Sequence, residues 1–232
     1  MKKKGIALVE RQYLFPFVLI TSLFFLWGFA HAILDVLNKH FQELLTITRT
    51  HSAMIQATMY MGYFIMAIPA GLFINRHGYR KGVVLGLLLY GIGSLLFIPG
   101  QYIASFNMFL FSLFVIGCGL TFLETAANPY VTELGARETA ASRLNFAQSF
   151  NGLGCIFAPI LTGLLLFSDE DKGASGNVAL PYAVMGVIVL LAALAFMRVR
   201  LPEIPHEEEV DSEGHRVGLW AHKLFVFGLV AL

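Results

Sequence analysis

The chain has 232 residues, of which 57% are hydrophobic and 13% charged, with a formal net charge of +1. A soluble domain carries about a quarter charged residues, so this composition excludes an ordinary soluble protein and predicts a membrane protein. The small net charge and the dispersed basic residues exclude a nucleic-acid-binding surface. Cys118 and Cys155 fall inside apolar runs without a spaced motif, so neither a disulfide nor a metal site is supported.

Six apolar runs are long enough to cross a bilayer, which takes about 20 residues in a helix. We expect spans at 14–37, 53–74, 82–104, 107–130, 144–167 and 180–198. The first run follows three lysines but is too long for a secretion signal and lacks a cleavage site. The sequence therefore predicts an all-α membrane protein with six spans.

Another apolar run begins near residue 222 and continues to the last residue, Leu232. We interpret it as the start of a seventh helix, and the chain as the first half of a longer protein or a truncated product. Segment 199–221 contains two prolines and three consecutive glutamates without apolar periodicity, which indicates a solvated linker. An acidic docking site in this segment is the alternative.

The distribution of basic residues predicts the orientation, because cytoplasmic loops are enriched in Lys and Arg. With the N-terminus inside, 13 basic residues lie on the cytoplasmic side and only Lys39, Arg49 and Lys172 lie outside. We therefore predict a cytoplasmic N-terminus at 1–13, a six-helix membrane half at 14–198, a cytoplasmic linker at 199–221 and the start of a seventh helix at 222–232.

Glu124 lies inside a long apolar run, where a carboxylate costs on the order of 3 kcal/mol. Acids are retained at such depth where they face a wet cavity or a proton path. Asp35 is a second intramembrane acid, toward the outer end of the first span. Two structural alternatives remain open: Asp35 can anchor its helix at the interface, and Glu124 can pair with Arg143 or a neighbouring amide.

The loop after the second span combines two glycines with basic residues, which are expected to form a tight reversal held at the cytoplasmic face. Its candidate gating residues are Gly71, Asn75, Arg76, Gly78 and Arg80. The loop resembles the Gly-x-x-x-Asp-Arg-x-Gly-Arg-Lys signature of the major facilitator superfamily, with Asn75 in place of the acid. Positive-inside anchoring alone explains the charges but not the glycines.

Four stretches make the resemblance more specific: 24–29, 56–64, Leu-Glu-Thr-Ala-Ala-Asn-Pro at 123–129 and Arg-Leu-Asn-Phe-Ala-Gln-Ser-Phe-Asn at 143–151. Together they resemble the fucose–galactose–glucose:proton symporter family within that superfamily. This resemblance implies a twelve-helix fold, of which this chain is the N-terminal half with 3+3 inverted repeats. It also implies that Asp35 is the protonation site and that Glu124 links proton and sugar.

Amides and phenols at helical spacing are candidates for sugar binding. Gln56, Tyr60 and Tyr63 share one helical face, and Gln148 and Asn151 share another. The family resemblance places Gln148 and Asn151 in the sugar cavity. Intramembrane amides also bind neighbouring helices together, so a packing role stays open for each of them.

His31 lies one helical turn before Asp35, so it is a candidate for tuning that acid or carrying its proton, with packing as the alternative. We interpret Asn128 and Pro129 as a bend in the fourth span, and Trp27 as either a sugar-stacking or a packing residue. The family pattern Asn-x-Asn-Asp before the first-span acid is absent here, which leaves fucose, glucose, galactose and amino sugars open as substrates.

The sequence therefore predicts a proton-coupled monosaccharide symporter that imports sugar across the bacterial inner membrane. An uncoupled facilitator and a non-transporting sugar sensor of the same fold are the alternatives. An intramembrane enzyme is disfavoured because no nucleophile with its base and no phosphate-cradling loop occurs. We expect no cofactor besides the coupling proton, no metal, a small sugar and the lipid bilayer as partners, no nucleic acid, and a monomer at full length.

Overall fold

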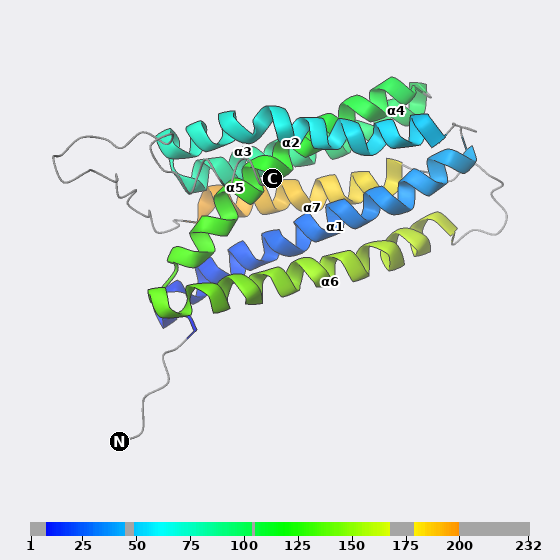
Figure 1. Cartoon of the computed structure of the whole chain (residues 1–232). Coiled ribbons are helices and arrows are strands. Elements are labelled where there is room, and N and C mark those ends of the chain that lie inside the picture. The colour runs from blue at the N-terminus through cyan, green and yellow to red at the C-terminus, as the bar shows by residue number, and fades with distance from the viewer. Residues whose placement is uncertain (1–7, 45–48, 104, 168–178, 200–232) are drawn as a thin grey trace, which may run out of the picture.

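The computed structural model describes residues 8–44, 49–103, 105–167 and 179–199, and this part of the chain is a bundle of long helices that lie side by side (Figure 1). The predicted linker, apart from residue 199, and the predicted seventh helix lie outside the described residues. The helices are α1 (Leu14–Leu44), α2 (Arg49–His77), α3 (Tyr79–Leu95), α4 (Phe97–Ile103), α5 (Phe106–Glu133), α6 (Ala140–Phe167) and α7 (Ala179–Arg198), with 3-10 turns at Arg11–Tyr13 and Arg137–Thr139.

The helices coincide with the six predicted spans. Within the part of the chain that the structure describes, five stretches are long and apolar enough to cross a membrane: Arg11–Val36, Ala53–His77, Tyr79–Ile103, Phe106–Glu133 and Ala179–Arg198. The third combines α3 and α4, which are separated only at Leu96. The remaining helix, α6, has 28 residues and coincides with the predicted span at 144–167. The expected all-α membrane architecture is confirmed.

The packing of the helices relates two sets of three. The fullest contacts pair α1 with α6, α2 with α5, and α3 with both α5 and α7. If α1, α2 and α3–α4 form one repeat and α5, α6 and α7 the other, exchanging the repeats turns the α1–α6 contact into the α5–α2 contact. The two contacts are therefore equivalent, as inverted repeats require.

Glycines bring α1 and α6 into close contact at their crossing. A Cβ atom added to Gly28 would lie 2.1 Å from the carbonyl oxygen of Asn151, and one on Gly154 would lie 2.2 Å from that of Phe25. Only residues without a side chain fit at such distances. The backbones of α1 and α6 can touch because both positions are glycine.

The crossing of α2 with α5 repeats this arrangement. A Cβ atom on Gly62 would lie 2.7 Å from the carbonyl oxygen of Phe114, and one on Gly117 would lie 2.3 Å from that of Met59. At both crossings each glycine faces the residue three positions before its partner glycine. The shared pattern makes Gly28 equivalent to Gly117, and Gly154 equivalent to Gly62.

The turn between α2 and α3 is made by one of the two predicted glycines. Gly78 has φ 85°, a left-handed conformation that favours glycine, and its N–H donates to the carbonyl of Ile74 across 2.8 Å. The prediction that Gly71 also forms the reversal is wrong. Gly71 lies inside α2, which continues to His77, and a Cβ atom there would meet nothing within 4 Å.

Arg143 at the start of α6 is fully buried and holds the α5–α6 corner together. Its guanidinium donates to the carbonyls of Val131 at 3.0 Å and Ala136 at 3.0 Å, and to the Thr139 hydroxyl at 2.6 Å. Two further bonds reach the carbonyls of Thr132 and Leu8. These bonds join the end of α5 to the start of α6, so Arg143 is a structural clamp rather than a partner of Glu124.

Candidate functional site

The two intramembrane acids occupy equivalent places in the two repeats. Asp35 follows the crossing glycine Gly28 by seven residues, and Glu124 follows the equivalent Gly117 by seven residues. Two helical turns therefore separate each acid from its crossing. Since α1 and α5 are the first helices of their repeats, the fold itself relates Asp35 to Glu124.

Asp35 makes a direct contact with a predicted sugar-site residue. The side-chain amide of Gln56 in α2 donates a hydrogen bond to Oδ1 of Asp35 across 3.1 Å, and both side chains are exposed. Because both side chains are exposed, either one can exchange this hydrogen bond for one to water or to a hydroxyl group of a substrate. This contact joins α1 and α2, the first two helices of one repeat.

Aromatic side chains form a wall next to this pair. Trp27 Nε1 donates to the Tyr63 hydroxyl across 3.0 Å, and the ring of His31 lies 5.9 Å from that of Trp27 and 6.0 Å from that of Tyr63. The ring of Tyr60 lies 6.2 Å from that of Tyr63, and Tyr60 is 57% exposed. Amphipathic rings with polar atoms at their edges suit the alternating apolar and hydroxyl faces of a sugar.

The tautomer of His31 follows from its hydrogen bond. Its Nδ1 lies 3.1 Å from the carbonyl oxygen of Trp27. A carbonyl only accepts, so Nδ1 carries a hydrogen and, in the neutral ring, Nε2 is the basic nitrogen. The hydrogen bonds among the described residues leave Nε2 without a partner. It therefore remains able to accept a proton or a hydroxyl hydrogen.

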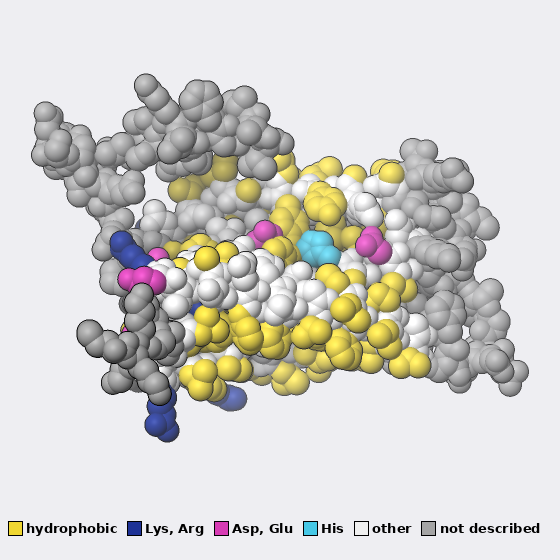
Figure 2. Space-filling view, turned by 60° about the horizontal axis from the view of Figure 1, so that its bottom comes forward, with side chains coloured by type: hydrophobic (Ala, Val, Ile, Leu, Met, Phe, Trp, Pro, Cys, Tyr) yellow, Lys and Arg dark blue, Asp and Glu magenta, His cyan; other side chains and the backbone are white. Residues whose placement is uncertain are grey.

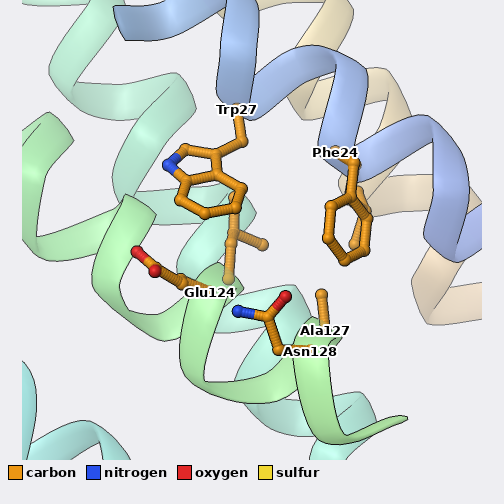
Figure 3. Close-up of a pocket in the computed structure, with 7 residues that line it drawn as sticks. Phe24, Trp27, Glu124, Ala127 and Asn128 are labelled. Carbon is orange, nitrogen blue, oxygen red and sulfur yellow. The ribbon is translucent and has the colours of Figure 1, made fainter. Parts of the chain in front are cut away.

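Glu124 lines a small pocket between α1 and α5. Figure 3 shows Trp27 and Phe24 of α1 facing Glu124, Ala127 and Asn128 of α5 across it. Trp27 also belongs to the aromatic wall, so it connects the surroundings of Glu124 with those of His31. The remaining lining residues are Leu23 and Leu123.

The sequence predicts that Asn128 is part of a helix bend, whereas the structure places it in this pocket. Its Oδ1 is buried and has no hydrogen-bond partner among the described residues. A buried amide oxygen without a donor is costly, so a hydroxyl or amide group that enters the pocket can donate to it favourably. Its position one turn after Glu124 is the sequence signal that identifies it.

The two predicted site residues of α6 have different surroundings. Asn151 lies at the α1 contact, where its amide donates to the carbonyl of Phe24 across 3.3 Å. Gln148, one turn earlier, is half-buried, and no side-chain hydrogen bond joins it to another described residue. The structure therefore gives Asn151 a helix-packing contact and leaves the amide of Gln148 available.

The candidate site lies away from the basic end of the bundle. Figure 2 shows acidic side chains and a histidine in the middle of one face, while the visible basic side chains gather at one end. At that end Arg80 donates to the carbonyls of Phe196 and Met197, so it caps α7. Asn75 and Arg76, which the sequence predicts in the gating loop, lie instead in the last turn of α2 and are exposed.

Comparison with known proteins relates nearly the whole chain to one superfamily. Residues 17–231 match the family described as Major Facilitator Superfamily. The L-fucose-proton symporter of Haemophilus influenzae is 38% identical over 86% of this chain and 52% of its own length. The glucose/galactose transporter of Brucella abortus is 35% identical over 96% of this chain and 55% of its own length. The chain thus spans about half the length of these curated relatives.

A solved structure gives the same relation in three dimensions. The fucose:proton symporter FucP of Escherichia coli superimposes with a TM-score of 0.69 at 37% identity. The superposition covers 83% of this chain and 50% of FucP. The arrangement of these six spans is therefore similar to half of a known sugar symporter.

Proposed function

This chain belongs to the major facilitator superfamily, and we propose that it forms the N-terminal half of a proton-coupled monosaccharide symporter. The substrate is an L-fucose-like sugar, or glucose or galactose, which are the sugars named for its relatives. Membrane proteins of this superfamily cross the bilayer many times, and we place this one in a bacterial inner membrane. The excess of basic residues in alternate loops supports a cytoplasmic N-terminus.

The observation that carries the proposal is the equivalence of Asp35 and Glu124. Each acid lies seven residues after the crossing glycine of its own helix, Gly28 or Gly117. Trp27 lines the pocket of Glu124 and donates a hydrogen bond to Tyr63 of the aromatic wall. Intramembrane acids are retained for ion or proton paths. We assign Asp35 to the protonation step and Glu124 to the link between the proton and the sugar.

The sugar site combines three kinds of groups. Tyr60, Tyr63 and Trp27 offer ring faces and hydroxyl or indole edges, and Gln56 and Gln148 offer amides. Asn128 adds an unpaired acceptor to the Glu124 pocket. Asn151 contributes by fixing α6 against α1, because its amide is bonded to the backbone of α1. The second half of the transporter would close this wall of the cavity.

The test is sugar-dependent alkalinisation of the medium around cells that express the full-length protein with this chain. A symporter takes up protons with sugar, so addition of fucose, glucose or galactose should raise the external pH. Uptake of labelled sugar without alkalinisation would identify an uncoupled facilitator. Absence of both would refute transport and favour a sugar sensor. A protonophore should abolish sugar accumulation in the first case only.

A further inference from the structure

The pair of Asp35 and Gln56 has an equivalent pair in the other repeat, and the two residues of that second pair are not hydrogen-bonded to each other. Asp35 lies seven residues after Gly28, and Gln56 lies six residues before Gly62. In the second repeat, the residue seven positions after Gly117 is Glu124, and the residue six positions before Gly154 is Gln148. The fold therefore assigns each repeat one acid on its first helix and one glutamine on its second.

The two acid–amide sets differ in their contacts. Gln56 donates to Asp35 across 3.1 Å. Within the described residues, no hydrogen bond joins Glu124 to Gln148; Glu124 lines the pocket beside Trp27 and Gln148 is half-buried. The same chemical groups at equivalent positions thus have two different arrangements in one structure.

Two repeats with equivalent helix crossings have equivalent accessible arrangements. When inverted repeats exchange their arrangements, the molecule changes the side from which its central site is open. We propose that Glu124 and Gln148 form a second acid–amide hydrogen bond, which is made in the alternative state in which the Asp35–Gln56 bond is open. This inference rests on the proposed transport function, because it assigns the two bonds to the two ends of a transport cycle.

The two glutamines should therefore have opposite effects on the equilibrium between the described state and the alternative state. Each amide N–H stabilises the state in which it meets its acid, and a carboxylate acceptor makes that bond stronger than a neutral one. Removal of Gln56 destabilises the state described here, and removal of Gln148 destabilises the alternative. Both hydrogen bonds join groups of the protein itself, so their effect on the equilibrium between the two states should be present without sugar. Sugar shifts this equilibrium only through its different affinities for the two states.

If Gln148 only contacted sugar, its substitution would give a different result. A residue that only binds sugar changes affinity but leaves the sugar-free equilibrium between the two states unchanged. The decisive measurement is therefore made without sugar. It compares Gln56→Ala and Gln148→Ala in the full-length protein reconstituted in membranes.

The equilibrium can be followed with two cysteine reporters on α2. Ala53→Cys and Ala67→Cys lie seven residues before and after Tyr60, so they share its helical face toward opposite ends, and both positions are exposed. The ratio of their alkylation rates by a membrane-impermeant maleimide, applied to both sides, reports which end of the cavity is open. Protein without an added cysteine gives the background reaction of Cys118 and Cys155.

We expect Gln56→Ala and Gln148→Ala to change this ratio in opposite directions, each by roughly threefold to tenfold. Gln56→Leu and Gln148→Leu provide a second pair, because leucine removes the amide donor but keeps a side chain in its place, and they should reproduce the two signs. Asn145→Ala removes an exposed amide from α6 and serves as the control with an unchanged ratio. Shifts of the same sign, a shift in only one glutamine variant, or no shift would overturn the proposal.

Failure of this inference is distinguishable from failure of the proposed function. Alkalinisation by the unsubstituted protein tests proton-coupled sugar uptake and does not depend on the alkylation ratio. If alkalinisation occurs and the two glutamine variants shift alike, the acid–amide exchange is refuted while symport stands. If alkalinisation is absent, symport is refuted, and the ratio still reports whether the two amides oppose each other.

Discussion

The indole Nε1 of Trp27 donates a hydrogen bond to the hydroxyl of Tyr63 across 3.0 Å and thereby joins α1 to α2 at the aromatic wall. Trp27 also lines the pocket of Glu124, and Tyr63 contacts the rings of His31 and Tyr60. One hydrogen bond therefore fixes the position of two rings that face different parts of the candidate cavity.

Removal of this hydrogen bond should weaken sugar binding without removing the rings. We expect Tyr63→Phe to raise the KM for sugar uptake severalfold, since a hydrogen bond contributes about 1 kcal/mol net. Trp27→Phe should have a similar effect, and the double variant should add little because the bond is already absent. KM values for the four proteins form a double-mutant cycle, and fully additive effects would show that the bond does not position the rings.

Asp35→Asn should abolish proton coupling while preserving the local structure. The asparagine side-chain oxygen can still accept the hydrogen bond from Gln56, but the side chain can no longer bind and release a proton. We expect sugar-dependent alkalinisation to disappear while exchange of labelled sugar across the membrane continues. Glu138→Gln, in the 3-10 turn before α6, is the matched control and should remain coupled. Coupled uptake by Asp35→Asn would exclude this acid as the protonation site.

His31→Asn separates the packing role of the imidazole from its proton chemistry. The asparagine amide can donate to the Trp27 carbonyl as Nδ1 does, but it cannot replace the basic Nε2. If His31 tunes Asp35, the pH dependence of uptake should flatten, because asparagine neither binds nor releases a proton. His31→Gln should flatten it as well. A pH profile that both substitutions leave intact would assign His31 to packing.

Gly28→Ala should destabilise the protein through the α1–α6 crossing. The new methyl group would lie 2.1 Å from the Asn151 carbonyl oxygen, so the helices must separate. Overpacking of this kind costs roughly 1–3 kcal/mol, which should lower the melting temperature in detergent. Gly152→Ala is the control, because its Cβ would meet nothing within 4 Å. Equal melting temperatures for the two variants would contradict the close crossing.

Arg143→Met should unfold the α5–α6 corner more easily. The substitution removes every donor of a fully buried guanidinium and with it the hydrogen bonds to the carbonyls of Val131, Thr132 and Ala136. We expect the free energy of unfolding to fall by roughly 2–4 kcal/mol. Arg76→Met, at an exposed position near the end of α2, should change it little. An unchanged denaturation midpoint for Arg143→Met would show that water replaces the lost donors.

The membrane fold and the two acids were predictable from local sequence. A span needs about 20 apolar residues whatever its neighbours are, so the six runs identified the helices directly. An acid such as Glu124 in an apolar run is conspicuous for the same reason, because hydrocarbon penalises its charge. The left-handed turn at Gly78 also follows from a local property, the freedom of glycine to adopt positive φ.

Other features depend on which helices meet, and no local pattern contains that information. Gly71 was expected in the turn but lies inside α2, because the helix continues six residues further. Local sequence predicts a bend at Asn128. The structure shows that α1 lies across the pocket from Asn128, so the Asn128 Oδ1, which has no partner among the described residues, belongs to the site. Arg143 was a possible partner of Glu124, but the end of α5 supplies its acceptors instead.

The spans and the two acids follow from the sequence alone, because hydrophobic length and buried charge are properties of single segments. How those segments correspond follows only from their packing, since the equivalence of Asp35 with Glu124 depends on two glycine crossings between helices far apart in the chain. The crossings fix the helix register through contacts between backbones, and through that register the structure relates Gln56 to Gln148.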